Sequence, residues 1–249
     1  MRKRVDKLVV ERGLSPTREK ARRLILAGDV LVDESPVDKP GALVRDDAEI
    51  RLRRPPKPYV GRGGEKLAGA LDATGIDPTG WNVLDVGAST GGFTDCLLKR
   101  GARAVTALDV GKGQLDWKLY SDPRVRVVEE VNARYLDPGD FPEPFDLVTV
   151  DVSFISLTKV LGALLPLVAH EGFVLMLVKP QFELGPEDVE KGGLVHDPKK
   201  HLRAIEAAAA AAADLDLRVL DVVPSPLKGA SGNQEYFLLT RRSRRGERP

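Results

Sequence analysis

Two charged side chains close apolar segments that are predicted to be strands. Asp151 ends the segment 146–151, and Lys179 follows the segment 173–178. In an open α/β sheet, ligands bind at the carboxyl ends of the parallel strands. A carboxylate and an ammonium group at that edge can orient a reacting group or exchange a proton with it. The competing interpretation of Lys179 is an ordinary surface lysine whose aliphatic stem covers apolar neighbours.

A glycine-rich turn follows an earlier predicted strand and indicates a cofactor pocket. The strand 81–86 leads into Gly87-Ala88-Ser89-Thr90-Gly91-Gly92, which opens a predicted helix. Glycines in such a turn allow a ligand to approach the backbone closely. The spacing G-x-x-x-G-G differs from the G-x-G-x-x-G of dinucleotide sites. A strand that ends in an acidic residue before the turn, here Asp85, is typical of sites for S-adenosylmethionine, which has no pyrophosphate.

The next strand ends at Asp109, 24 residues after Asp85. A carboxylate at this point can accept hydrogen bonds from both hydroxyls of a ribose. After the third strand come Asn132 and Ala133, which are candidates for contacts with an adenine edge. One acidic strand end by itself is more simply an ordinary capped loop. Two in order, with a glycine turn after the first, favour a nucleotide-type cofactor.

These residues need a sheet to position them, and the pattern from residue 62 onward predicts one. Apolar strands are expected near 82–86, 104–109, 125–128, 146–151, 173–178, 218–223 and 235–241. Helices are expected at 63–74, 91–100, 113–120, 155–169 and 198–213. Such alternation predicts a doubly wound α/β sheet, a Rossmann-like domain of seven strands.

The first quarter of the chain predicts a separate small α+β domain. Two short helices are expected at 5–13 and 17–27, with Ser15 as cap of the second, and short strands at 30–33 and 48–53. The proline-rich segment 54–58 cannot form regular structure, because proline removes a donor and fixes φ. We therefore expect domains at 1–58 and 59–249.

Residues 1–60 hold 15 Lys and Arg against 10 Asp and Glu, although the whole chain has a net charge of only +1. Such an asymmetry is typical of a segment that binds phosphate. The competing interpretation is a chance scatter of surface charge.

Composition excludes several classes of protein. The single cysteine, Cys96, allows neither a disulfide framework nor a thiolate zinc site, and we expect it to be buried. His170, His196 and His201 have no ligand-like spacing, so we expect no metal. We read His196 as part of a helix-entry cap or a substrate contact. No apolar run of about 18 residues exists, and no apolar stretch follows the basic N-terminus. A cytoplasmic protein is expected.

Seven segments carry a family resemblance through nearly the whole chain. They are Gly61–Leu67 (GRGGEKL), Gly87–Asp95 (GASTGGFTD), Asp109–Leu115 (DVGKGQL), Asp151–Leu157 (DVSFISL), Val178–Glu183 (VKPQFE), His196–Pro198 (HDP) and Ser231–Phe237 (SGNQEYF). In these segments the chain resembles the TlyA (haemolysin A-like) family of bacterial rRNA 2′-O-ribose methyltransferases, which share the FtsJ-like fold. The first 60 residues resemble the small RNA-binding domain, of the ribosomal-protein S4 type, that some pseudouridine synthases also carry.

The resemblance implies a class I methyltransferase domain, S-adenosylmethionine as cofactor and a catalytic tetrad of Lys66, Asp151, Lys179 and Glu235. The implied cofactor-binding residues are Asp85, Gly87, Ala88, Ser89, Thr90, Gly91, Gly92, Phe93, Asp109, Val110, Asn132, Ala133 and Asp151. A ribose hydroxyl is a poor nucleophile that must lose its proton as it attacks a sulfonium methyl group. A free lysine is protonated at neutral pH and cannot act as a base, so its neighbours must tune it. The hypothesis is that Lys179 orients and deprotonates the hydroxyl, Asp151 positions Lys179, and Lys66 and Glu235 fix the ribose. Asp95 could contact the cofactor or cap a helix.

The implied partner is ribosomal RNA within assembled ribosomal subunits, with a cytidine of 16S or 23S rRNA as acceptor. A basic helical face suits phosphate contacts, which position rather than specify. The expected RNA-binding residues are Arg4, Lys7, Arg18, Lys20, Arg22 and Arg23. Phe154, Phe182 and Tyr236 are candidates for stacking on a flipped nucleotide. The alternatives are a non-catalytic ribosome-assembly factor, a membrane-active haemolysin and a small-molecule methyltransferase.

Overall fold

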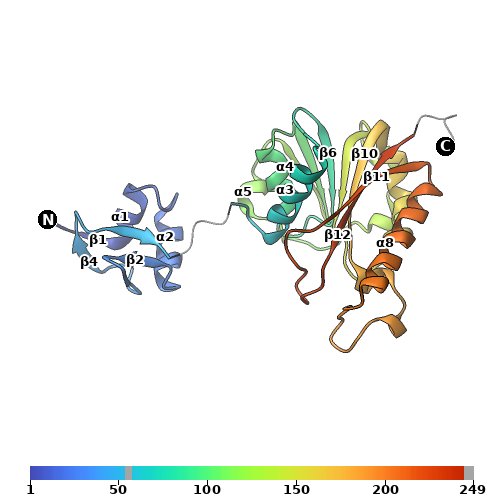
Figure 1. Ribbon diagram of the computed structural model, residues 1–249. Helices are drawn as coiled ribbons and strands as arrows, with labels where there is room; N and C mark the ends of the chain where they lie inside the picture. Colours follow the sequence, from blue (N-terminus) through green and yellow to red (C-terminus); the bar gives the residue numbers. More distant parts are fainter. Residues whose placement is uncertain (54–57, 244–249) are drawn as a thin grey trace. The chain divides into compact units, whose positions relative to one another are not determined.

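The chain forms two compact units, Met1–Lys57 and Pro58–Pro249 (Figure 1). The computed structural model describes residues 1–53 and 58–243. Residues 54–57 of the expected proline-rich segment therefore lie outside the described residues.

The first unit has two helices and two small antiparallel sheets, as expected for an α+β domain. The helices are α1 (Val5–Glu11) and α2 (Arg18–Leu26). One sheet pairs β1 (Arg2–Arg4) with β4 (Leu43–Arg45), and the other has the order β3 (Ser35–Pro36), β2 (Val30–Val32), β5 (Ile50–Leu52). The expected cap of α2 is wrong. The side chain of Thr17 accepts from the Lys20 N–H, whereas the buried Ser15 hydroxyl donates to the Thr17 carbonyl.

The second unit contains one mixed sheet of seven strands, which confirms the predicted Rossmann-like fold. The strand order is β11-β12-β10-β9-β6-β7-β8. The bounds are β6 (Asn82–Val86), β7 (Ala104–Leu108), β8 (Val125–Val128), β9 (Phe145–Val150), β10 (Val168–Val178), β11 (Leu217–Pro224) and β12 (Tyr236–Arg242). β12 pairs antiparallel with both of its neighbours, whereas β8, β7, β6, β9 and β10 pair in parallel.

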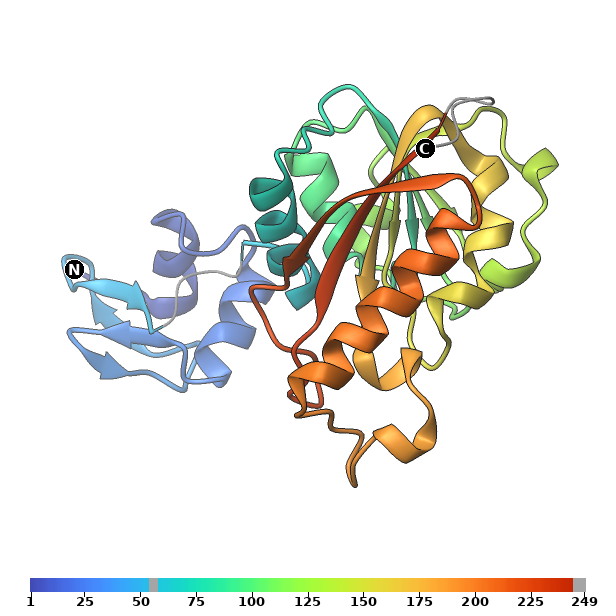
Figure 2. The ribbon, with the colours of Figure 1, turned by 45° about the vertical axis from the view of Figure 1, so that its right-hand side comes forward.

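Helices cover both faces of this sheet. α3 (Arg62–Thr74) and α4 (Gly92–Lys99) pack on one face, and α6 (Leu161–Leu164) and α8 (Pro198–Ala213) pack on the other (Figures 1 and 2). Two further short helices are α5 (Trp117–Tyr120) and α7 (Pro180–Glu183). The 3₁₀ turns are η1 (Ala133–Tyr135), η2 (Pro138–Asp140), η3 (Leu157–Lys159), η4 (Leu165–Leu167) and η5 (Pro186–Asp188).

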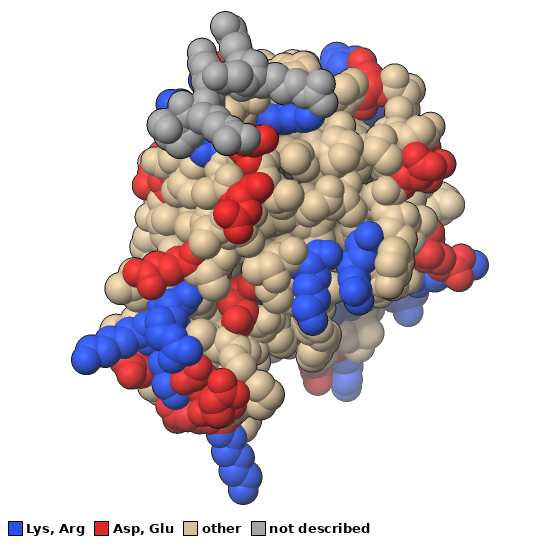
Figure 3. Space-filling model, turned by 90° about the vertical axis from the view of Figure 1, so that its right-hand side faces the viewer, with Lys and Arg blue, Asp and Glu red and all other residues tan. Residues whose placement is uncertain are grey.

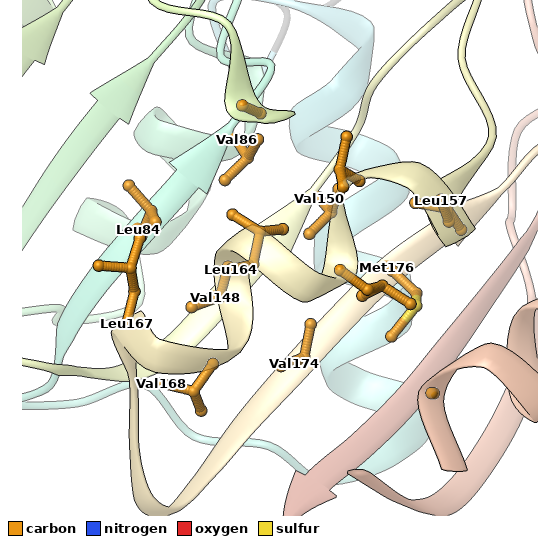
Figure 4. Packing of buried hydrophobic residues seen from close by; sticks show 14 of the residues in the cluster. Leu84, Val86, Val148, Val150, Leu157, Leu164, Leu167, Val168, Val174 and Met176 are labelled. Atoms are coloured by element: carbon orange, nitrogen blue, oxygen red, sulfur yellow. The ribbon is translucent and has the colours of Figure 1, made fainter. Parts of the chain in front are cut away.

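Alternation along the central strands divides the core into two layers. On β9, Val148 and Val150 face the layer that contains α6 and α8, and Leu147 faces the layer of α3 and α4. Figure 4 shows Val148 and Val150 beside Leu164 of α6 and Met176 of β10. Side chains of a strand alternate between the faces, so a strand buried on both sides is mostly apolar along its length. This packing fixes the strand ends at which the charged residues lie.

The helix expected at 155–169 is wrong. The chain forms η3, α6 and η4 there, and β10 already begins at Val168. Pro166 lies near the start of η4, where the missing N–H of a proline is tolerated. A short apolar run cannot be assigned to helix or strand from its pattern alone, which explains the error.

Candidate active site

The register of the sheet brings the predicted catalytic residues to one edge. Asp151 follows β9 and Lys179 follows β10, and these strands pair in parallel. β12 runs the other way and pairs Tyr236 with Val178, so Glu235 enters the sheet beside Lys179. The carboxyl ends of β9 and β10 and the start of β12 therefore meet at the same place.

Lys179 is buried and its ammonium group has three acceptors. The Nζ lies 2.7 Å from Asp151 Oδ1, 2.9 Å from the Val152 carbonyl oxygen and 2.8 Å from Ser153 Oγ. An ammonium group has three N–H bonds, so all of them are used. Ser153 is exposed, which makes its hydroxyl the acceptor that an incoming ligand can most readily replace.

Lys66 and Glu235 form a second buried pair. Lys66 lies on α3, and its Nζ is 2.5 Å from Glu235 Oε2. A Cβ atom at Gly229 would collide with Glu235 Oε1, so a side chain there would require the Glu235 carboxylate to move. Removing one member of a buried ion pair leaves an uncompensated charge, so the two groups depend on each other. The four tetrad residues thus form two lysine–carboxylate pairs.

The glycine turn lies against the backbone of Asp151, a predicted catalytic residue. Gly87 has φ +85°, and a Cβ atom there would also collide with the Asp151 carbonyl oxygen. The backbone conformation and the close approach both require glycine. Ser89 and Thr90 are exposed on the turn, whereas Ala88, Gly91, Gly92 and Phe93 are buried. The close contact at Gly87 therefore places the predicted cofactor turn next to Asp151.

Asp109, which directly follows β7, stabilises this turn through hydrogen bonds. Its carboxylate accepts from the N–H groups of Ser89, at 2.8 Å, and Gly111, at 2.7 Å. A carboxylate has about four lone-pair sites, so it retains capacity for ribose hydroxyls. Val110 is exposed beside it. Asn132 is exposed and caps η1 through the Arg134 N–H, and Ala133 is buried.

Asp85 differs from the expectation of a direct cofactor contact. Its carboxylate is fully buried and accepts hydrogen bonds from the hydroxyls of Thr94, at 2.7 Å, and Thr149, at 3.1 Å. Burial raises its pKa to about 7, while the two threonine hydrogen bonds oppose that shift. Asp85 therefore links β6 to Thr94 of α4 and Thr149 of β9.

Two further expectations concern α4. Asp95 accepts from the Val60 N–H, at 2.9 Å, and from Lys99 Nζ, at 2.8 Å, so it holds the segment before α3. Cys96 is buried as expected, and burial raises the pKa of its thiol to about 11.

Sequence reasoning missed Ser153 as a partner of Lys179, and it missed Glu183 as a partner of a loop. Glu183 accepts from Ser156 Oγ, at 2.6 Å, and from the Leu157 N–H, at 3.0 Å. Both motifs were visible in the sequence, but no spacing rule links residues 26 or 27 positions apart.

The basic residues of the first unit fall into two groups. The buried Asp6 carboxylate accepts from Arg4, at 3.0 Å, and from Arg18, at 2.9 Å, and the hydrogen bonds of Arg4 lower its pKa to about 2. Arg23 pairs with Glu19 on the surface of α2. Over the described residues, no ion pair involves Lys7, Lys20 or Arg22. Elsewhere the charge is mixed, and Figure 3 shows a face on which acidic and basic side chains are interspersed.

Within residues 1–53 and 58–243, no group of three or more His, Cys, Asp or Glu side chains is arranged to hold a metal ion. The same residues include no helix long and apolar enough to cross a membrane.

Comparison with known proteins gives matches over both units. Residues 59–242 match the FtsJ-like methyltransferase family, and residues 3–50 match the S4 domain. The chain is 47% identical over 241 residues to the 16S/23S rRNA (cytidine-2′-O)-methyltransferase TlyA of Mycobacterium tuberculosis, covering 96% of this chain and 90% of the relative. It is 41% identical to a protein named Hemolysin A from Brachyspira hyodysenteriae, covering 94% and 98%. A solved Streptococcus thermophilus structure that is given the name hemolysin has a TM-score of 0.75 and 40% identity, covering 97% of this chain and 89% of that one.

Proposed function

Because the chain belongs to the TlyA family of FtsJ-like methyltransferases and carries an S4 domain, we propose that it methylates the 2′-hydroxyl of a cytidine in ribosomal RNA. The observation that carries this proposal is the meeting of two lysine–carboxylate pairs beside a glycine turn at one edge of the sheet. A cytoplasmic location follows from such a substrate.

The residues present fit S-adenosylmethionine as cofactor. Gly87 leaves the turn without a side chain next to Asp151, and Ser89, Thr90 and Val110 are exposed around it. Asp109 is placed to accept from ribose hydroxyls. When bound, S-adenosylmethionine would supply a methyl group on a sulfonium. Of the other predicted cofactor residues, Asn132 is exposed, and the buried ones would support the site from beneath: Asp85, Ala88, Gly91, Gly92, Phe93 and Ala133.

Lys179 would receive the acceptor hydroxyl. The ribose oxygen takes the place of Ser153 Oγ on the ammonium group, so that Lys179 orients it while Asp151 and the Val152 carbonyl hold the lysine. Deprotonation by Lys179 requires a neutral amine, since an ammonium group has no lone pair. Asp151, in contact with Nζ, is the group to which the lysine can first pass a proton. Lys66 and Glu235 would fix the ribose from the other side.

The S4 domain would supply contacts with the RNA backbone. Arginine binds phosphate with several N–H groups at once, and a backbone contact positions the enzyme without reading sequence. We assign this role to Arg4, Lys7, Arg18, Lys20, Arg22 and Arg23. The acceptor lies in 16S rRNA, 23S rRNA or both, and the assay below separates these possibilities.

The test is transfer of a tritiated methyl group to purified 30S and 50S ribosomal subunits, with the site mapped by blocked reverse transcription. Lys179→Ala should abolish labelling and retain S-adenosylmethionine binding in calorimetry, and Lys118→Ala, an exposed lysine, is the control. Labelling of neither subunit by the wild type would overturn the rRNA assignment. It would favour a non-catalytic assembly factor if the protein still bound subunits. Full activity of Lys179→Ala would overturn the role of Lys179.

A further inference from the structure

The loop between β9 and η3, residues 152–157, is held at both ends by one short segment. At its start, Lys179 Nζ donates to the Val152 carbonyl and to Ser153 Oγ. At its end, the Glu183 carboxylate accepts from Ser156 Oγ and from the Leu157 N–H. Lys179 and Glu183 are joined by the single turn of α7, which the Phe182 N–H closes onto the Lys179 carbonyl at 2.8 Å. The two ends of the loop are thus set by one rigid turn.

The middle of this loop is strained. Phe154 has φ +63° and its side chain is 92% exposed. A bulky residue in this left-handed conformation is strained and persists only where the surrounding structure enforces it. The ring contacts Phe182 of α7, with 5.2 Å between ring centroids, and the residue is otherwise largely exposed over the described residues. The hydrogen bonds at the loop ends are therefore what enforce the conformation.

Glu183 has no part in the charge arrangement around the reacting atoms. Its carboxylate is partly buried, its recorded partners are the two loop groups, and no ion pair to it occurs over the described residues. Burial raises its pKa, which a nearby cation would oppose. Holding a carboxylate in this place without a cation costs free energy, which its hydrogen bonds to Ser156 and Leu157 offset.

We propose that Glu183 is a positioning residue, which fixes the 152–157 loop so that Ser153 and Phe154 meet the acceptor nucleotide. The proposal rests on the proposed function, because it names what the loop presents to the RNA. Ser153 keeps the third N–H of Lys179 in place until the ribose hydroxyl arrives. Phe154 offers an aromatic face on which a base can stack, and such stacking tolerates any base.

The kinetic test compares Glu183→Ala and Glu183→Gln with Glu187→Ala, an exposed acidic residue of the next turn. In Glu183→Ala, KM for the ribosomal subunit should rise roughly tenfold to a hundredfold, the range expected for lost hydrogen bonds to a charged group. Affinity for S-adenosylmethionine should not change. Glu183→Gln should recover much of the loss, because its amide oxygen can still accept from the Leu157 N–H. An unchanged KM in Glu183→Ala, or a parallel loss of cofactor binding, would overturn the proposal.

A double-mutant cycle asks whether Glu183 acts through the loop. Glu183→Ala should raise KM much less in a Phe154→Ala background than in the wild type, because the presented ring is already gone. Additive effects would contradict the proposal.

A third measurement needs no activity. A nitroxide attached to Phe154→Cys reports the mobility of the loop, since the natural Cys96 is buried. Adding Glu183→Ala should sharpen the spectrum and adding Glu187→Ala should not. If the wild type labels no subunit but the spectra behave in this way, the proposed function has failed and the positioning of the loop has not. Identical spectra with and without Glu183 would overturn the positioning role.

Discussion

Each unit of this protein holds carboxylates against cations, but the cations differ. In the first unit, Asp6 is buried beneath Arg4 and Arg18, whose side chains are 42% and 51% exposed. In the second unit, Asp151 and Glu235 pair with Lys179 and Lys66, whose side chains are only 9% and 11% exposed. The first arrangement leaves the cations open to solvent, and the second encloses them.

The chemistry of the two side chains explains this difference. A guanidinium group has five N–H donors in a planar fork, so an arginine anchored to Asp6 still presents donors outward. An ammonium group has three, and Lys179 uses all of them on protein acceptors. The arginines can therefore bind phosphate as they stand, whereas Lys179 binds a ligand only by exchanging one acceptor. The proposed RNA-binding surface and the proposed reaction centre differ in this property.

The largest expected effect comes from breaking an enclosed pair. Lys66→Met should lower the free energy of unfolding by about 3–5 kcal/mol, because Glu235 is left buried without its cation. Adding Glu235→Gln should restore most of that stability, although the double variant lacks two tetrad residues and should be inactive. Urea unfolding of the three proteins measures both effects. Equal stability of the single and double variants would show that the charge of Glu235 is not the cause.

Asp85 is a buried carboxylate that forms hydrogen bonds with two threonine hydroxyls and, over the described residues, no ion pair. Its pKa is raised to about 7, so its protonated form stabilises the fold below its ordinary pKa of 3.8, and this contribution is lost as pH rises through about 7. The loss reaches at most about 4 kcal/mol. Asp85→Asn should remove this slope, because threonine hydroxyls can accept from an amide as well as donate. Unfolding midpoints of both proteins between pH 4 and 8 provide the measurement, and parallel curves would contradict it.

Asp6 should show the opposite dependence on pH. Its pKa is lowered to about 2, so its contribution is present above 3.8 and is lost as pH falls toward 2. Asp6→Asn should cost about 1.5–3 kcal/mol at neutral pH, the range for a hydrogen bond to a charged group. The same variant should bind ribosomal subunits less tightly, since Arg4 and Arg18 lose their fixed orientation.

Glu34→Gln is the control for Asp6→Asn. Glu34 pairs with Arg51 on the surface of the same unit, and solvent-exposed pairs contribute little to stability. Its effect on subunit binding should be small. If Glu34→Gln weakened binding as much as Asp6→Asn, the arginine arrangement on Asp6 would have no special role.

Features of the two units that follow from local sequence patterns could be predicted, whereas contacts between residues distant in the sequence could not. Strand ends follow from local apolar patterns, so Asp151, Lys179 and the turn at Gly87 were predicted at one edge without any structure. Lys66 and Glu235 are 169 positions apart; the family resemblance placed both in the tetrad, but their ion pair was not predicted. The burial of Asp85 and the hydrogen bonds of Glu183 depend on threonine and serine hydroxyls from other elements, which no sequence pattern identifies.

The smallest expected effect tests a pair that is exposed on both sides. Arg23 and Glu19 lie one turn apart on α2, and such a pair stabilises a helix by only about 0.3–0.5 kcal/mol. Arg23→Gln should therefore leave the thermal midpoint almost unchanged. It should also weaken RNA binding less than Arg22→Gln does, because Glu19 already occupies part of the Arg23 guanidinium whereas no ion pair involves Arg22 in the described chain. Glu19→Gln should then tighten binding by releasing Arg23, and the slope of binding against salt should steepen as one more phosphate is neutralised. If Arg22→Gln and Arg23→Gln weakened binding equally and Glu19→Gln had no effect, pairing on this surface would not govern which cations reach the RNA.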